Sequence, residues 1–496
     1  MIKILFDLDS MPSHQDLISQ YWPHIIFVIS GLASTFAAIH AAMTKKDVRA
    51  ATGWVAVILF SPLFGALLYA IAGINRIHKA RVTQQRTGTA YSEDVIEHVL
   101  VRDVTPYSGP QFTGLKKLGD HISDFNLLGC NEIKLLSGGD ETYPAMLAEI
   151  EQAKHSIAMQ SYIFDSDTIG TKIAQALIDA KNRGVEVRVL IDAVGSRYSH
   201  PPIAKMLLKA GVTTALFLPP AFGLKLVYAN LRSHRKLLVV DGFRGLTGGM
   251  NIRESFLTEF AKEHVTHDTH FQVSGPIAHQ LMISFAMDWQ FTTQEKLLGE
   301  LWFPKKKVTD LLEHGVPLRC VVSGPDHSLE NNQKMILGAL SLAQKHVRIQ
   351  SPYFLPDQSL IAVLATTARR GVVVDIVIPG ANNLKLVDAA MSAQLDQLLN
   401  TGCRIWRSKG SFDHSKLFTV DGRWSFVGSS NLDPRSLRLN FELDLEVYDQ
   451  TLAEQLDQRI DGVIAKSERV TLHALAKAPY LIRLRNKIVW LASPYL

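Results

Sequence analysis

The chain has 496 residues, of which 47% are hydrophobic and 20% charged, and its formal net charge at pH 7 is +5. This composition is that of a globular protein of two or three domains, and the mild positive charge is compatible with anionic lipid or nucleic acid without selecting either. The three cysteines, Cys130, Cys320 and Cys403, are odd in number and lie far apart in the sequence, so no disulfide framework and no metal-binding spacing can be read from them. A buried structural role in a reducing compartment is expected for all three.

Two long apolar segments near the start of the chain predict a membrane hairpin. Residues 22–43 and 50–74 contain no Asp, Glu, Lys or Arg. At roughly 1.5 Å per residue, each segment is long enough to cross a hydrocarbon core of about 30 Å as a transmembrane helix. Only six residues separate the two segments, so both ends of the hairpin are expected on one side of the membrane.

A cleaved signal peptide and a buried core hairpin are the alternatives to this membrane hairpin. The N-terminal tail, residues 1–21, carries one lysine against three aspartates, unlike the basic start of a signal peptide. Five basic residues flank the ends of the hairpin and three lie in its loop, which favours a cytoplasmic position for the rest of the chain. Residues 75–110 are polar and irregular and are interpreted as a linker.

The remainder of the chain repeats one pattern of elements. The runs AKHSIAMQSYIF and AQKHVRIQSPYF each lead into a helical stretch and then into a β-branched run that follows Gly184 or Gly371. A strand, a helix ended by glycine and a second strand are therefore expected in each half. We predict an α/β fold with two pseudo-symmetric halves, residues 111–310 and 311–496, each a mixed sheet flanked by helices.

A duplicated motif carries the functional prediction. The pattern His-x-Lys-x4-Asp occurs within residues 230–256 and again within residues 409–436, and each copy is followed by a small-residue turn that ends in asparagine. A single copy is more often a solvated strand face, but two copies with matching asparagines indicate a duplicated half-site. The residues of the two copies are His234, Lys236, Asp241 and Asn251, and His414, Lys416, Asp421 and Asn431.

The residue types in this duplicated motif suit a phosphodiester. Side chains at i and i+2 share one face of a strand, so each histidine and its lysine are expected to point the same way, toward the interface between the halves. Lysine ammoniums and asparagine amides can bind the phosphoryl oxygens. One neutral histidine can attack phosphorus to form a phosphohistidine, while the other donates a proton to the leaving oxygen and then activates an acceptor hydroxyl.

Four acidic residues are assigned supporting roles. Asp268 and Glu442 stand at matching places after the two motifs and are candidates for orienting the histidine rings. Asp241 and Asp421 belong to the motif, but each precedes a glycine and is expected to organise a tight turn rather than to transfer protons. The sequence has no Walker-type loop and no His-Glu-x-x-His cluster, and two lysines can supply a metal's charge, so no metal and no cofactor is expected.

This duplicated motif resembles the signature of the phospholipase D superfamily, and the chain is similar more narrowly to the bacterial cardiolipin synthases that begin with a membrane hairpin. The resemblance covers nearly the whole chain. One departure is residues 385–400, where members of the family often carry tyrosines and this chain has none. The blocks that carry the resemblance are Trp54, Pro62, Gly65, Tyr69 and Gly73 of the hairpin, YIF with Asp167 and Gly170, NLRSHRK, Asp288-Trp289, SGPD, PYFLPD, and GSSNLDPRS with Asn440 and Glu442.

The resemblance implies an enzyme of the bacterial inner membrane that converts two phosphatidylglycerol molecules to cardiolipin and glycerol. Phosphatidylglycerol and other anionic phospholipids would be its partners, without nucleic acid. His234 is expected to be the nucleophile and His414 the acid and base. The alternatives are a hydrolytic phospholipase D, a phosphodiester nuclease of the same superfamily and a non-catalytic membrane scaffold.

Two further stretches suit a lipid substrate. Residues 219–229 form an apolar lip before the first motif. In residues 480–496, a helical arrangement places four apolar side chains on one face, near three basic residues, as expected of a helix on a membrane surface or equally of one packed on the core. These four are Leu481, Leu484, Ile488 and Leu491.

Overall fold

The computed structural model of the protein describes residues 14–45, 47–74, 91, 99–219, 231–305 and 315–493. The chain divides into two units, Met1–His78 and Lys79–Leu496, called here the apolar unit and the catalytic unit. Most of the apolar lip expected at residues 219–229 lies outside the described residues.

The apolar unit begins with the 31-residue helix α1 (His14–Thr44). Its segment Tyr21–Thr44 is the one helix of the described residues that is long and apolar enough to cross a membrane. Most of its side chains face outward, but Ala37 and Ala41 pack with Ile58 and Tyr69 of the following segment. His40 Nδ1 lies 2.8 Å from the Tyr69 hydroxyl, which ties this segment to α1.

The second apolar segment is not the single helix expected over residues 50–74. It forms α2 (Val48–Phe60), α3 (Pro62–Leu68) and the π-helical turn η2 (Tyr69–Gly73). The helix breaks because Ser61 adopts φ −141° and Pro62 has no backbone N–H. A Cβ on Gly65 would lie 2.3 Å from the Val57 carbonyl oxygen, so glycine lets α3 fold back along α2. The number of membrane crossings and their orientation stay predictions.

The catalytic unit is built on one continuous sheet whose two parts have the same strand order. The first part runs β1 (Leu128–Ser137), β8 (Thr269–Ser274), β7 (Arg244–Gly248), β6 (Leu237–Val240), β2 (Ser156–Ser161), β3 (Glu186–Asp192) and β4 (Thr213–Phe217). The second part runs β9 (Val316–Ser323), β15 (Asn440–Val447), β14 (Trp424–Gly428), β13 (Leu417–Val420), β10 (His346–Gln350), β11 (Val373–Pro379), β12 (Arg404–Ser408) and β16 (Glu468–Arg469).

The two parts of the sheet join where β1 pairs antiparallel with β9. Within each part, strands are parallel in β2–β3–β4 and β10–β11–β12 and antiparallel elsewhere. The short strand β5 (Arg232–Ser233), which leads into the first motif, pairs with β15 of the other half. The prediction of two pseudo-symmetric α/β halves is thus confirmed.

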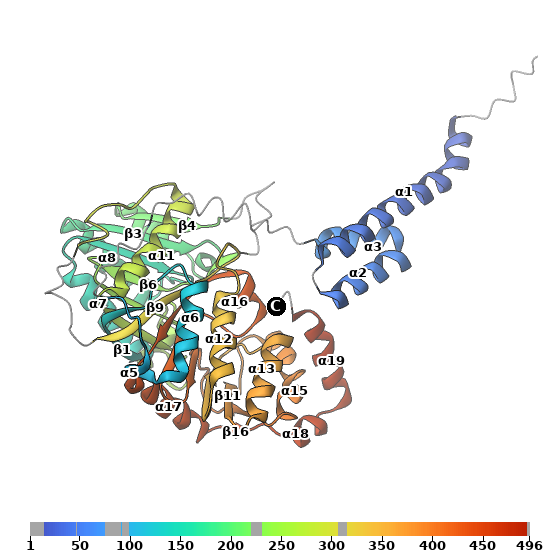
Figure 1. Cartoon of the computed structure of the whole chain (residues 1–496). Helices are drawn as coiled ribbons and strands as arrows, with labels where there is room; N and C mark the ends of the chain where they lie inside the picture. The colour runs from blue at the N-terminus through green and yellow to red at the C-terminus, as the bar shows by residue number, and fades with distance from the viewer. Residues whose placement is uncertain are drawn as a thin grey trace, which may run out of the picture. The chain divides into compact units, whose positions relative to one another are not determined.

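Helices cover both faces of this sheet (Figure 1). Ile157 and Met159 of β2 pack into one hydrophobic cluster with the helices on the first face, whereas Gln160 faces the other way and donates to Asp288 of α11. The first-half helices are α7 (Gly138–Gln152), α8 (Thr168–Asn182), α9 (Ile203–Lys209), α10 (Thr258–Ala261) and α11 (Ile277–Thr293), with the 3-10 turns η5 (Gly195–Tyr198), η7 (Glu254–Phe256) and η8 (Lys262–His264).

The second half repeats this arrangement of helices around its strands. Its helices are α12 (Asn331–Leu342), α13 (Gln358–Arg369), α14 (Lys385–Ser392), α15 (Leu395–Leu399), α16 (Pro434–Arg438), α17 (Gln450–Ile464), α18 (Leu472–Lys477) and α19 (Tyr480–Leu491).

Local signals in the sequence explain the boundaries of these elements. Asp167 and Asp357 cap α8 and α13 by accepting from backbone N–H groups of Gly170 and Leu360, both at 2.9 Å. The expected glycines after these two helices, Gly184 and Gly371, have φ +92°, a conformation that favours glycine. The three cysteines are free and buried, as expected.

The expected linker, residues 75–110, ends earlier than predicted. Val99 and Val104 are buried, and the Ser108 hydroxyl donates to the Arg423 carbonyl oxygen at 2.7 Å. The helical segments α5 (Thr105–Ser108), η4 (Pro110–Phe112) and α6 (Thr113–Ile122) follow without a break. Residues from 99 onward therefore belong to the catalytic unit, because apolar side chains among polar ones anchor them to its core.

Candidate active site

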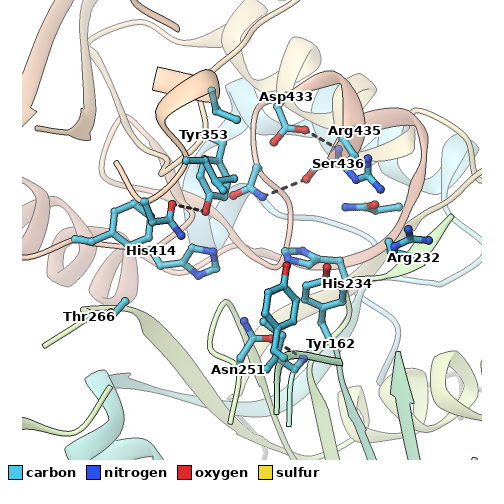
Figure 2. A pocket seen from close by; sticks show the side chains of 18 of the residues that line it. Tyr162, Arg232, His234, Asn251, Thr266, Tyr353, His414, Asp433, Arg435 and Ser436 are labelled. Atoms are coloured by element: carbon cyan, nitrogen blue, oxygen red, sulfur yellow. Dashed lines mark hydrogen bonds between the residues drawn. The ribbon is translucent and has the colours of Figure 1, made fainter. Parts of the chain in front are cut away.

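The two predicted histidines line one cavity of about 530 Å³ in the catalytic unit. Figure 2 shows the rings of His234 and His414 approaching each other from opposite sides of this cavity. Asn251 and Asn431, the asparagines that follow the two motifs, line it as well. The structure therefore brings the duplicated half-sites together, and the two rings share one space.

Each motif is held by the half of the chain to which it does not belong. The His234 backbone N–H donates to the Phe441 carbonyl oxygen at 2.9 Å, and the His414 backbone N–H donates to the His267 carbonyl oxygen at 2.7 Å. These reciprocal hydrogen bonds fix both histidines relative to the opposite half, so the cavity geometry depends on both.

The two acidic candidates also reach across the interface. The Nδ1 atom of His234 lies 3.1 Å from Glu442 Oε2, and that of His414 lies 2.9 Å from Asp268 Oδ2. Both carboxyl groups are fully buried. When Nδ1 of each ring carries the proton and hydrogen-bonds to the carboxylate, Nε2 keeps its lone pair and is available to attack phosphorus or to accept a proton. The matching places of Asp268 and Glu442 in the sequence thus predicted correctly that each lies beside a histidine ring.

The two lysines of the motifs are buried, and neither is among the residues that line the cavity. Lys236 Nζ donates to the His234 carbonyl oxygen at 2.7 Å, and Lys416 Nζ donates to the carbonyl oxygen of His414. Burial lowers the pKa of Lys236 to about 7 and lowers that of Lys416. Burial thus disfavours the positive charge of both lysines, and a bound anion would stabilise it.

Their surroundings favour the neutral form of both histidines. Burial, followed by the charges of Lys416 and Lys236, holds the pKa of His414 well below its ordinary value. Burial also lowers the pKa of His234, although the Glu442 carboxylate opposes the shift. For Glu442 itself, burial raises the pKa, but His234 and Lys236 outweigh it and the net shift is downward, so this carboxylate is firmly ionised.

Asp268 differs from Glu442 in its ionisation. Burial raises its pKa more than Lys416 and the Thr269 backbone N–H lower it. Lys416 Nζ also lies 2.8 Å from His414 Nδ1, the same atom that faces Asp268. One ring nitrogen cannot donate to the carboxylate and accept from the ammonium together, and the matching geometry at His234 favours donation to Asp268.

The motif aspartates lie away from the cavity. Asp241 accepts backbone N–H groups of residues 154–156, the nearest at 2.7 Å from His155, and Asp421 does the same for residues 344–346. Their φ values are +50° and +56°, and the glycine after each has φ +63°, as in a type I′ turn. This placement agrees with the expected role of the two aspartates in a turn. It does not agree with direct participation in the reaction.

The asparagines differ in how they are held. Asn251 Oδ1 accepts from the Ile163 backbone N–H at 3.1 Å, which turns its amide NH2 group toward the cavity wall. Asn431 Nδ2 donates to the Ser436 hydroxyl at 3.2 Å, while its buried Oδ1 has no hydrogen-bond partner among the described residues. Both side chains can offer amide donors to a phosphoryl oxygen after small rotations.

Sequence reasoning missed a pair of tyrosines beside the histidines. The ring of Tyr162 meets that of His234 edge-on at 5.2 Å between centroids, and the ring of Tyr353 meets that of His414 at 6.0 Å. Both tyrosines line the cavity. The signal in the sequence was weak: Tyr162 follows β2 and Tyr353 follows β10, but aligning QSYIF with QSPYF pairs Tyr162 with Pro352 rather than with Tyr353.

Sequence reasoning also missed three arginines of the cavity wall, Arg232, Arg253 and Arg435. Arg253 is paired with Asp165, whose Oδ2 accepts from its Nη2 at 2.7 Å. Arg232 precedes His234 by two residues, so strand alternation could have placed it on the same face. Within the described residues no group of three His, Cys, Asp or Glu side chains converges as a metal site, and metal-independent chemistry stays a prediction.

Comparisons with known proteins agree with this geometry. A model of the family "Cardiolipin synthase, PLD-like domain" matches residues 146–289 and 336–464, once in each half, and "Phospholipase_D-nuclease N-terminal" matches residues 32–73. Cardiolipin synthase A of Pseudomonas entomophila (strain L48) is 32% identical over 487 residues, which cover 97% of this chain and 100% of that protein. The chain belongs to the cardiolipin synthase family.

Members of the cardiolipin synthase family from other bacteria match as broadly. The cardiolipin synthase of Oceanobacillus iheyensis is 31% identical over 460 residues, which cover 92% of this chain and 95% of that protein. Among solved structures, a phosphatidylserine synthase of Haemophilus influenzae Rd KW20 matches with a TM-score of 0.60 and 18% identity, covering 77% of this chain and 100% of that chain. This likeness shows a shared fold of two α/β halves.

Proposed function

We propose that this member of the cardiolipin synthase family transfers a phosphatidyl group from one phosphatidylglycerol to another, releasing glycerol, through a phosphohistidine. The observation that carries the proposal is the pair of histidines in one cavity, each oriented by a carboxylate from the opposite half at 2.9–3.1 Å. Such a pair supplies a nucleophile and a separate proton carrier around one phosphorus atom.

In the first step Nε2 of His234 attacks the donor phosphorus, and the bond from phosphorus to the glycerol headgroup oxygen breaks. The leaving alkoxide takes a proton from Nε2 of His414, so glycerol departs and a phosphatidyl group remains on His234. The negative charge of the bound phosphodiester favours the protonated form of His414, which burial alone disfavours.

In the second step His414, now neutral at Nε2, removes the proton from the primary hydroxyl of a second phosphatidylglycerol. The resulting oxygen attacks phosphorus, the phosphorus–nitrogen bond breaks, and cardiolipin leaves with His234 restored. The ammoniums of Lys236 and Lys416 and the amides of Asn251 and Asn431 bind the phosphoryl oxygens in both steps. Water in place of the lipid hydroxyl would give phosphatidic acid, which is the hydrolytic alternative.

The assignment of His234 as nucleophile is supported by the difference between the carboxylates. The lowered pKa of Glu442 favours its ionised form, whose charge raises the electron density of the His234 ring, whereas the raised pKa of Asp268 means that this carboxyl group gives up its proton less readily beside His414. The stronger lowering of the pKa of His414 also makes its protonated form the better acid. Trapping the phosphohistidine and mapping it by mass spectrometry tests the assignment, and a map to His414 would reverse it.

Product analysis tests the function itself. The full chain in detergent, given labelled phosphatidylglycerol, is expected to release cardiolipin and glycerol in equal amounts. Phosphatidic acid as the sole lipid product would support the hydrolytic alternative, and cleavage of DNA or RNA under the same conditions would support the nuclease. Phosphatidylethanolamine offered as the donor measures substrate range, and an excess of chelator is expected to leave turnover unchanged.

We further propose that the protein is a multi-pass protein of the bacterial inner membrane with its catalytic unit in the cytoplasm. Support comes from the apolar helix Tyr21–Thr44 and from the excess of basic residues at the ends of the apolar unit. Protease added to intact spheroplasts is expected to spare the catalytic unit, and degradation there would place it on the outer side.

A further inference from the structure

The cavity wall holds more positive charge than one phosphodiester requires. Arg232 and Arg435 both line the cavity, and Figure 2 shows them together on the side of His234 that is away from His414. Burial lowers the pKa of Arg232 most, and the charges of Arg435 and Arg197 lower it further, so these guanidinium groups are near enough to act on Arg232. Because arginine is common where a phosphate is recognised, two guanidinium groups on one side of the cavity suit the binding of an anion.

Carboxyl groups lie close to these arginines. Asp192 stabilises the charge of Arg232, and its carboxylate also accepts the backbone N–H groups of Ser233, Val194 and Gly195. Asp433 caps α16 through the Ser436 backbone N–H at 2.8 Å, and burial raises its pKa to about 6. Arg253 on the same cavity wall pairs with Asp165, with Nη2 2.7 Å from Oδ2.

Both arginines are built into the motif segments. Arg232 lies on β5, whose pairing with Asn440 of β15 holds it two residues before His234. Arg435 lies on α16, four residues after Asn431, and both side chains are half-buried. They are therefore fixed relative to the reacting phosphate and face the same cavity, but on one side of it.

We propose that Arg232 and Arg435 form a second phosphodiester subsite, which binds the phosphate of the acceptor lipid while its free hydroxyl reaches the phosphorylated histidine. This proposal rests on the function proposed above. An acceptor phosphatidylglycerol carries its own phosphodiester one glycerol unit from the reacting hydroxyl, whereas water or a simple alcohol carries none. The subsite would thus select a lipid acceptor over water without taking part in the bond changes.

The test compares two acceptors for one donor. Wild-type protein, given phosphatidylglycerol and ethanol together, is expected to make cardiolipin and phosphatidylethanol. In Arg232→Gln/Arg435→Gln, cardiolipin formation should fall by about tenfold or more while phosphatidylethanol formation does not fall, because a charge-assisted hydrogen bond is lost only for the lipid acceptor. Arg232→Lys/Arg435→Lys keeps the charge and should give an intermediate ratio.

Arg438→Gln is the matched control, because Arg438 lies on the same helix, is exposed and pairs with Glu330 at 3.2 Å. It should leave both products unchanged. The subsite is refuted if both products fall together in variants whose thermal unfolding matches that of the wild type. It is also refuted if the ratio of cardiolipin to phosphatidylethanol does not change. The lysine variants decide the question if the glutamine pair unfolds. Failure of the proposed function is a different result, namely wild-type protein that makes no cardiolipin.

A second inference comes independently from α19, whose two faces differ. Val489 and Trp490 pack against the core of the second half, and Trp490 Nε1 donates to Gln394 Oε1 at 2.8 Å. The four apolar side chains singled out in the sequence face solvent. Their exposed fractions are 74% for Leu481, 42% for Leu484, 58% for Ile488 and 73% for Leu491.

Charge and position indicate what covers this face. Residues 471–496 contain no Asp or Glu but four Lys and Arg residues, so the segment is complementary to an anionic surface. Helix α19 packs on the α14 region, where Lys487 Nζ donates to the Ala393 carbonyl oxygen at 2.5 Å. At the start of α14, Leu384 and Leu386 are also exposed, and Leu384 lines the catalytic cavity. The exposed apolar residues thus continue to the cavity wall.

We infer that the exposed face of α19 rests on the anionic surface of a lipid bilayer and turns the cavity mouth toward the lipid headgroups. The apolar side chains would enter the boundary between headgroups and acyl chains, and Arg483 and Arg485 would contact lipid phosphates. The apolar unit tethers the chain, and this contact orients the catalytic unit.

The test uses the full chain reconstituted in phosphatidylglycerol vesicles. Leu484→Glu/Ile488→Glu should lower turnover of vesicle lipid roughly tenfold, because two buried apolar contacts with the membrane are lost, and leave turnover of a monomeric short-chain phosphatidylglycerol unchanged. The control is Leu208→Glu on α9, which replaces another exposed leucine. Equal loss on both substrates, as from a contact with another protein surface, or no loss on either, would refute the contact with the membrane.

Discussion

The two halves of the catalytic unit keep the same turn but surround their histidines differently. Asp241 and Asp421 each accept three backbone N–H groups, which lie at equivalent positions of the two halves. The carboxylate that meets His234 is a glutamate, and the one that meets His414 is an aspartate. The scaffold that positions the motif is therefore the same in both halves, while the surroundings of the two rings differ, which agrees with the different roles proposed for them.

The position between each histidine and lysine differs even more. Arg235 is buried and pairs with Asp288, with Nη1 3.0 Å from Oδ2. The side chain of its counterpart Ser415 makes a neutral hydrogen bond, its hydroxyl lying 2.8 Å from that of Thr269. The first motif is thus held by a buried ion pair and the second by a neutral hydrogen bond, so the halves should respond differently to substitution.

The largest expected effect separates the two histidines. His234→Ala and His414→Ala should each lower turnover by about three orders of magnitude or more, because each removes a step that no other group performs. In His414→Ala a phosphohistidine can still form slowly and should accumulate, whereas His234→Ala should yield none. Quench-flow with labelled phosphatidylglycerol measures both, and an intermediate in His234→Ala alone would exchange the two roles.

The next effect concerns stability. Arg235→Met should lower the free energy of unfolding by about 3–5 kcal/mol, because the Asp288 carboxylate loses its buried partner. Ser415→Ala should cost only about 1 kcal/mol, the value of a single neutral hydrogen bond. Denaturant unfolding of the two variants in the same detergent measures the difference, and equal losses would show that the motifs are held equally firmly.

A smaller effect is expected at the carboxylates. Glu442→Gln and Asp268→Asn should each lower kcat by about 10- to 100-fold with little change in KM, because they orient the rings and balance their charge without touching the lipid. The firmly ionised Glu442 should matter more for formation of the phosphohistidine, and Asp268 more for release of glycerol. Single-turnover kinetics separate the two steps, and identical defects in both variants would contradict the divided roles.

The smallest effect is a shift in pH dependence. Burial lowers the pKa of Lys236 to about 7, so kcat/KM for the anionic donor should fall as pH rises through this value. Lys236→Arg, which stays protonated, should move this alkaline limb upward by about one pH unit. Between about pH 7 and the ordinary value of 10.5 the unfolded chain binds more protons at Lys236, so its contribution to stability rises with pH in that window. An alkaline limb unchanged by the substitution would assign it to another group.

The sequence predicted the features that repeat. The two motifs, the strand–helix–strand pattern and the matching acidic residues could be found by comparing the chain with itself, and the structure brings Asp268 and Glu442 to the rings. Features set by long-range packing were not predicted. Tyr162 and Tyr353 lie near the histidines only because the strands that precede them converge, and nothing local distinguishes them from other tyrosines.

Boundaries were predicted less well than elements. Hydropathy alone does not register that Pro62 follows a residue with extended backbone, so residues 50–74 were taken as one helix although α2 ends at Phe60. Residues from Val99 onward were assigned to the linker because the segment is polar on average, although a few apolar side chains are enough to anchor it. In both places one or a few residues determine the structure, although the average hydropathy of the segment predicts otherwise.

Because each half of the catalytic unit supplies the carboxylate that meets the other half's histidine, the active site is complete only when both halves, or lobes, are present. Each lobe supplies one imidazole and the carboxylate that steadies the other lobe's imidazole. Either lobe expressed alone would hold a histidine without its acidic neighbour. A mixture of two inactive full-length chains, one mutated in each lobe, could regain turnover only by domain swapping, in which the intact lobes of two chains form one site. Genetic complementation between such alleles would therefore report directly on lobe exchange.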